Sequence, residues 1–88
     1  MYKITVTKED IAKGKPEFAN SCAIARAIRR VVGKKRVEVD SFGNININHR
    51  RWSSGAKYGM IRKFVDNFDD PGKRRYCRPF SFILKKDV

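Results

Sequence analysis

Residues 36–49 read Arg-Val-Glu-Val-Asp-Ser-Phe-Gly-Asn-Ile-Asn-Ile-Asn-His, and this stretch decides the fold. Polar and apolar residues alternate over residues 36–40 and again over residues 44–49, a pattern typical of strands with one buried face. The three residues between them include Gly43, which suits a tight turn. The stretch therefore predicts a β-hairpin, to which the rest of the chain must add strands and helices.

The flanking sequence supplies two more strands and two helices. Alternation predicts a first strand over residues 2–7 and a last strand over residues 79–85. Apolar residues at helical spacing predict a helix ending near residue 32 and a second helix over residues 56–68. The first helix would be capped by Asn20 or Ser21 and stopped by Gly33.

The remaining segments are expected to connect these elements. Residues 10–13 can form a single helical turn, and residues 50–55 and 73–78 are predicted to be loops. The resulting order is β-α-β-β-α-β, the ferredoxin-like order. We expect one α+β domain over residues 1–88, with two helices on one face of a four-stranded antiparallel sheet.

The charge balance points to an anionic partner. The chain carries 21 Lys and Arg against 9 Asp and Glu, a net charge of +12, and such an excess repels itself in a compact fold. Three segments carry cations with no acid between them: the first predicted helix with its exit, the loop after the hairpin, and the loop before the last strand. Their cations are Arg26, Arg29, Arg30, Lys34, Lys35 and Arg36, then Arg50 and Arg51, then Arg74 and Arg75. These side chains suit backbone phosphates, and on an exposed helix face their removal should change stability little.

Two aromatic residues lie inside the basic segments. Trp52 and Tyr76 could stack on unpaired bases. A lone tryptophan in a small domain is more often a partly buried plug over the end of the core, and both interpretations of Trp52 stay open. The open sheet face is predicted to carry no aromatic side chain, so any nucleic-acid site should use the first helix and the loops.

Catalytic chemistry is scarce. His49 is the only histidine, and its spacing from Cys22 and Cys77 matches no zinc pattern, so we expect no metal, no cofactor and no enzyme activity. A Cys22–His49 dyad is conceivable, but Cys22 fits better as a small core residue. The acids Asp66, Asp69 and Asp70 are expected to pair with the cations at residues 73–75.

The redox compartment follows from the same cysteines. Two cysteines are too few for a disulfide scaffold, and no export signal or run of about 20 apolar residues is present. We expect free thiols and a cytoplasmic location.

Four segments carry a resemblance to known proteins: residues 3–11 with Gly14 (KITVTKEDI-x-x-G), 21–30 (SCAIARAIRR), 64–69 (FVDNFD) and 78–84 (RPFSFIL). Together they resemble a family of small uncharacterised bacteriophage and prophage proteins. Members often have proline after the cysteine, where this chain has Ala23. The resemblance implies a phage-encoded accessory protein in the cytoplasm of a bacterial host, and it supplies no activity.

Two functions fit these observations. The first is binding of DNA or RNA, mainly through backbone phosphates. The alternative is inhibition of a host defence complex, as anti-CRISPR proteins do, through an acidic protein surface or a guide RNA.

Overall fold

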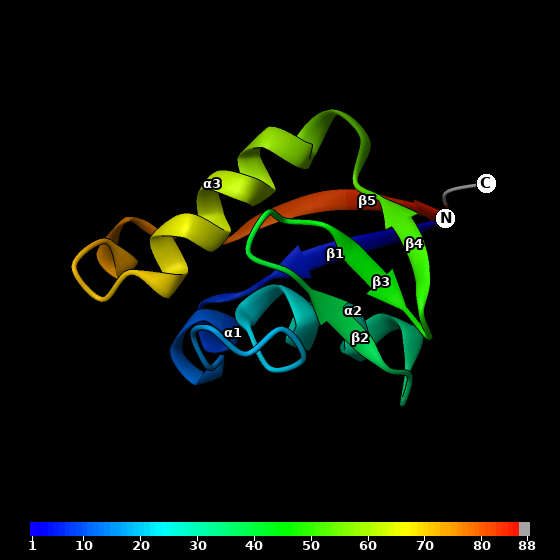
Figure 1. Cartoon of the computed structure of the whole chain (residues 1–88), viewed down its shortest axis with the longest axis horizontal. Helices are drawn as coiled ribbons and strands as arrows, with labels where there is room; N and C mark the ends of the chain where they lie inside the picture. Colours follow the sequence, from blue (N-terminus) through cyan, green and yellow to red (C-terminus); the bar gives the residue numbers. More distant parts are fainter. Residues whose placement is uncertain (87–88) are drawn as a thin grey trace.

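Five strands form one antiparallel sheet in residues 1–86, the part of the chain that the computed structural model describes (Figure 1). The strand order is β1-β5-β4-β3-β2, so β1 and β2 are the edges and β5 lies between β1 and β4. The strands are β1 (Tyr2–Val6), β2 (Val37–Val39), β3 (Ile45–Ile47), β4 (Arg50–Ser53) and β5 (Phe80–Lys86).

The helix α2 (Ala23–Val32) packs against both edge strands of this sheet, β1 and β2. The sheet can meet one helix at both edges only by curling, and Figure 1 shows the strands wrapped around this side of the molecule. A short helix, α1 (Lys8–Lys13), packs against α2, and α3 (Tyr58–Asp69) covers the end where β5 begins. Single 3₁₀ turns precede α3 (Gly55–Lys57) and β5 (Arg74–Tyr76).

One apolar cluster fills the concave side of the sheet. Inward residues of the strands and the buried faces of α2 and α3 belong to the same core. The ring of Phe64 on α3 lies 5.1 Å from that of Phe80 on β5, which ties the third helix to the sheet. The buried faces of α2 and α3 thus both contribute to the core on this side of the sheet. The core residues include Ile4, Val6, Ile24, Ile28, Val37, Ile45, Ile61, Phe68, Phe82 and Leu84.

Two glycines permit close backbone approaches in this core. A Cβ on Gly14 would lie 2.6 Å from the backbone nitrogen of Ala23, where the end of α1 meets the start of α2. A Cβ on Gly43 would lie 3.2 Å from the backbone of Arg62, and Gly43 has φ +84°. The turn between β2 and β3 can therefore rest directly on α3.

The predicted topology was incomplete, although the α+β class is correct. Residues 50–55 were expected to be a loop, yet Arg50–Ser53 forms β4, which joins β3 to β5. Residues 10–13 were expected to form a single helical turn, and the helix found there is longer: α1 spans Lys8–Lys13 behind a capping box. In that box the Thr7 side chain accepts from the Asp10 backbone N–H and the Asp10 carboxylate accepts from the Thr7 N–H, which stabilises a helix too short to persist alone.

The helix cap predicted at Asn20 or Ser21 was also placed too early. Cys22 caps α2, and its Sγ accepts from the Ala25 backbone N–H at 3.5 Å. None of the helices in residues 1–86 combines the length and the apolar character that crossing a membrane requires.

Candidate functional site

The sheet brings two of the predicted basic segments together at one end of the molecule. The backbone N–H of Arg36 donates to Asn48 Oδ1 at 3.0 Å, and the N–H of Asn48 donates to the Arg36 carbonyl at 2.8 Å. The segment that leaves α2 therefore lies beside the turn between β3 and β4, at the lower right of Figure 1. We call the exposed cations gathered here the basic pole: Lys34, Lys35, Arg36, Arg50 and Arg51.

The turn between β3 and β4 sets the direction of two of these cations. Ile47 pairs with Arg50 across a two-residue turn, in which Asn48 has φ +50° and His49 has φ +66°. Two left-handed residues are the signature of the tight hairpin turn whose twist matches the strands. Glycine and asparagine are the usual residues at such positions, and histidine also adopts the left-handed conformation more often than most residues. Arg50 and Arg51 follow this turn directly, at the start of β4.

The positive charge of the basic pole is little compensated. In residues 1–86 one acid pairs with it: Glu38 accepts from Arg36 Nε at 3.1 Å, with 62% of the Arg36 side chain and 34% of the Glu38 side chain exposed. Lys34, Lys35, Arg50 and Arg51 have no ion pair within the described residues. An ion pair near the surface, such as that of Arg36 with Glu38, has a weak interaction energy, so the electrostatic field around the basic pole stays positive.

The pole continues onto the open face of the sheet, where Arg51 lies opposite Asn46 and Ser53 lies opposite Lys85. Lys3 on β1 lies opposite Ile83, so two further lysines extend the positive surface. Sequence reasoning placed Lys3 and Lys85 on the open sheet face and left them out of the site, because that face carries no aromatic side chain for stacking. In residues 1–86 the outward positions of the strands carry no aromatic side chain, as expected: Lys3, Thr5, Glu38, Asn46, Arg51, Ser53, Ser81, Ile83 and Lys85.

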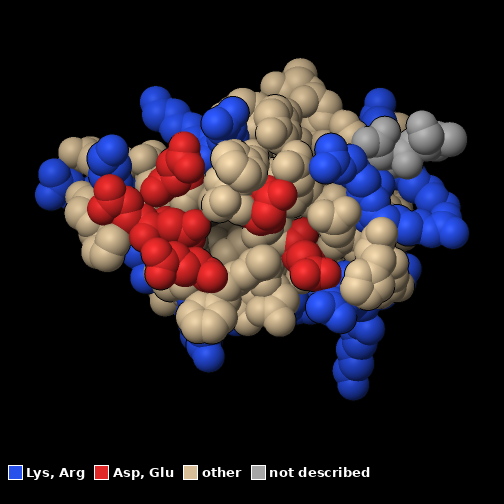
Figure 2. Space-filling view, in the orientation of Figure 1, with Lys and Arg blue, Asp and Glu red and all other residues tan. Residues whose placement is uncertain are grey.

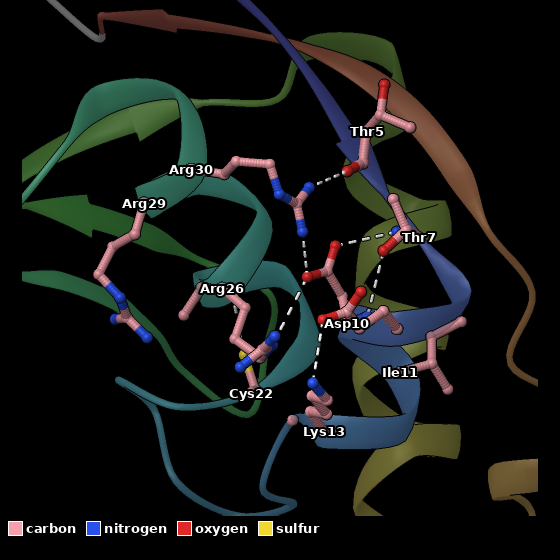
Figure 3. A network of polar contacts seen from close by, with 12 residues as sticks. Thr5, Thr7, Asp10, Ile11, Lys13, Cys22, Arg26, Arg29 and Arg30 are labelled. Atoms are coloured by element: carbon pink, nitrogen blue, oxygen red, sulfur yellow. Dashed lines mark hydrogen bonds and ion pairs between the residues drawn. The ribbon is translucent and has the colours of Figure 1, made fainter.

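Two of the predicted helix cations have a structural task instead (Figure 3). The carboxylate of Asp10 is fully buried beneath α2, where it pairs with Arg30 and lies 3.5 Å from Arg26 Nε. Arg30 also donates to the Thr5 carbonyl at 3.2 Å. Burial alone would raise the pKa of Asp10, but hydrogen bonds from Arg30 and Thr7 outweigh it and hold the pKa below its ordinary value.

These contacts correct the expectation that the cations of α2 are free. Arg30 keeps 48% of its side chain exposed and Arg26 keeps 32%, so both contribute charge to the surface while they hold α1 on α2. Arg29 donates to the backbone carbonyl of Asn20, at the start of the same helix. The Asp10 network was missed because its partners are far apart in sequence.

The third basic segment lies at the other end of the molecule, past α3 at the far left of Figure 1. The longest dimension of the molecule is 36 Å. Arg74 donates to the carbonyls of Ile11 and Gly14 and stacks 4.5 Å from the Phe68 ring, so it anchors the segment. Arg75 and Tyr76 are exposed, with the guanidinium 5.0 Å from the ring. This segment does not join the basic pole.

Trp52 lies at the edge of the core. It is half-buried, packs against the core and has its ring 5.7 Å from that of Tyr2. Of the two interpretations left open by the sequence, this position favours the plug.

The cysteines are buried and free. Burial raises the pKa of both Cys22 and Cys77, which keeps the thiols protonated at neutral pH. In residues 1–86 no group of three or more His, Cys, Asp and Glu side chains is arranged to hold a metal ion.

Comparisons with protein-family models, with curated proteins and with solved structures gave no match for this chain. The chemistry of the basic pole is therefore the guide to its function.

Proposed function

We propose that this chain is a small nucleic-acid-binding protein that contacts backbone phosphates through the basic pole. One observation carries the proposal: residues 34–36 and 50–51, separate in sequence, converge on one end of the molecule through the pairing of Arg36 with Asn48. Five cations with one paired acid form the kind of surface that phosphates neutralise, with release of counterions. The phage setting and the bacterial cytoplasm belong to the same proposal, on the strength of the sequence resemblance.

The protein acts by binding and not by catalysis. The open sheet face offers lysine and hydroxyl groups to a sugar–phosphate backbone, through Lys3, Lys85 and Ser81, but no aromatic platform in the described residues. Contacts to backbone phosphates carry no sequence information, so binding depends only weakly on the nucleic-acid sequence. Double-stranded and single-stranded nucleic acids are both suitable ligands.

The test is fluorescence anisotropy with labelled DNA and RNA, single- and double-stranded, at two or more salt concentrations. If about four to six cations contact phosphates, log K against log salt falls with a slope of about −3 to −5. The double substitution Arg50→Ala with Arg51→Ala weakens binding to all sequences alike and reduces the slope by up to about two.

A matched control removes the same charge elsewhere. Arg62→Ala with Lys63→Ala takes two adjacent exposed cations from α3, outside the basic pole. This control is expected to change affinity much less than the pole variant at equal salt. Equal losses from the two variants would show a diffuse charge effect without a site. No binding tighter than about 100 μM at low salt would refute the proposal and assign the cations to an acidic protein partner.

A further inference from the structure

Three acidic side chains of this basic protein line a cavity. Figure 2 views the face on which α2, α3 and β2 meet, and acidic side chains gather over its left part and its middle while cations lie around the outline. A cavity of about 290 Å³ opens there between the loop that precedes α2, the end of β2 and the C-terminal half of α3. Three of its lining residues are acidic: Glu17, Asp40 and Asp69.

The charge of the lining is opposite to that of the chain. Lys and Arg number 21 in the sequence, and none of them lines this cavity within the described residues. Asp66, Asp69 and Asp70 were expected to pair with the cations at residues 73–75, and that expectation is wrong: none of the ion pairs within residues 1–86 joins them. Asp69 instead accepts from the Glu17 backbone N–H at 2.8 Å, and Asp70 accepts from the Gly72 N–H at 2.9 Å.

The floor of the cavity is apolar. Buried side chains from three elements form it, and burial raises the pKa of the one thiol among them, so it carries no charge. At the rim Phe18 keeps 58% of its surface exposed, beside Glu17 with φ +66°. The apolar lining consists of Cys22, Ile24, Val39, Phe64, Val65 and Phe68.

The loop that carries Glu17 and Phe18 is held on both sides. Asp69 of α3 binds it at residue 17, and the N–H of Val39 donates to the Ala19 carbonyl at 2.8 Å. The cavity is therefore formed by three segments that are hydrogen-bonded to one another, and it is preformed in the absence of a ligand. Its volume is near the lower limit of small-molecule pockets, about 300 Å³, and suits one large side chain.

We infer that this cavity docks a basic peptide segment of a partner protein. An aromatic or aliphatic side chain of the segment fills the apolar floor, and its flanking Lys or Arg side chains face Glu17, Asp40 and Asp69. Charge complementarity selects this occupant, because nucleic acid and acidic proteins are repelled from the rim. The inference does not depend on the proposed function, since the two surfaces have opposite charge and share no residue.

The experiment uses two-dimensional ¹H–¹⁵N NMR of the full chain, freed of nucleic acid. The probe is acetyl-Lys-Lys-Phe-Lys-Lys-amide at up to about 5 mM, a range suited to weak binding. We expect saturable shifts at residues 17–19, 39–41 and 64–69. The matched peptide with Ala in place of Phe should bind at least about tenfold more weakly, because it loses the buried ring. The peptide with Glu in place of Lys should not shift the lining residues, although it can shift residues of the basic pole.

Variants of the chain test the rim. Glu17→Gln removes an exposed charge and should weaken binding of the Phe peptide about two- to threefold at low salt. Glu9→Gln is the control, because this exposed residue pairs with Lys13 on α1 and does not line the cavity. Equal binding of the Phe and Ala peptides, shifts confined to other residues, or no binding would each overturn the inference. Concentration-dependent shifts of the lining residues in the free protein would also overturn it, by showing that a second copy is the occupant.

Discussion

Replacement of Arg30 is expected to destabilise the protein, although the residue lies on the solvent side of α2. The Asp10 carboxylate beneath it is fully buried. Removing one partner from a buried ion pair costs about 3–5 kcal/mol, because the other charge is left without compensation. Here the cost is smaller, since Arg30 is 48% exposed and Arg26 Nε stays 3.5 Å from the carboxylate. We expect Arg30→Ala to lose about 2 kcal/mol, which lowers the melting temperature of a domain of this size by about 10 °C.

A double-mutant cycle isolates the pair. In an Asp10→Asn background no buried charge remains, so Arg30→Ala should cost within about 0.5 kcal/mol. The assay is urea unfolding followed by circular dichroism at neutral pH, for the wild type, both single variants and the double variant. Lys34→Ala serves as the control, because it removes one exposed cation that has no ion pair within the described residues. A loss from Arg30→Ala no larger than that of the control, or a coupling below about 0.5 kcal/mol, would refute the reasoning.

Three further predictions concern other parts of the chain. The pKa of Asp10 is lowered in the folded state. The stability that ionised Asp10 contributes is therefore complete above the unfolded pKa of about 3.9 and is lost as pH falls through the folded pKa. Acid titration should accordingly destabilise the wild type more than Asp10→Asn. Trp52→Ala should lower stability by about 2 kcal/mol, less than a fully buried ring would, and leave affinity for single-stranded DNA within about twofold; a loss of affinity without a loss of stability would restore the platform interpretation. Thiol titration of unfolded, unreduced protein should find two reactive groups, Cys22 and Cys77, whereas the folded protein should react slowly because both are buried; finding none would indicate a disulfide.

Strands with regular alternation were predictable, and β4 was not. Its four residues, Arg50 to Ser53, are mostly charged or polar, and the turn before it is Asn48-His49, where glycine is the usual signal. The strand forms because β3 and β5 lie on either side of it and satisfy its backbone. Tertiary pairing, and not local preference, decides such an element.

The candidate site was likewise predictable only in part. The cations at residues 34–36 and 50–51 were identified from the absence of acids between them, and the hydrogen bonds between Arg36 and Asn48 show that the two segments meet. Arg26 and Arg30 were taken as free because helical spacing places them opposite the apolar stripe. Their partner Asp10 becomes visible once α1 packs on α2, a contact that spans 20 residues between Asp10 and Arg30.

The hydrogen bonds at the two sheet edges bear on self-association. An edge strand offers unpaired N–H and C=O groups to a strand of another molecule, which is a common route to aggregation. On β1 the Thr5 carbonyl accepts from Arg30, and on β2 the Val39 N–H donates to the Ala19 carbonyl. Each edge thus has a backbone group already hydrogen-bonded within the chain. On β1 the partner of that group is the charged guanidinium of Arg30. Growth by strand addition is therefore disfavoured at both edges of the sheet.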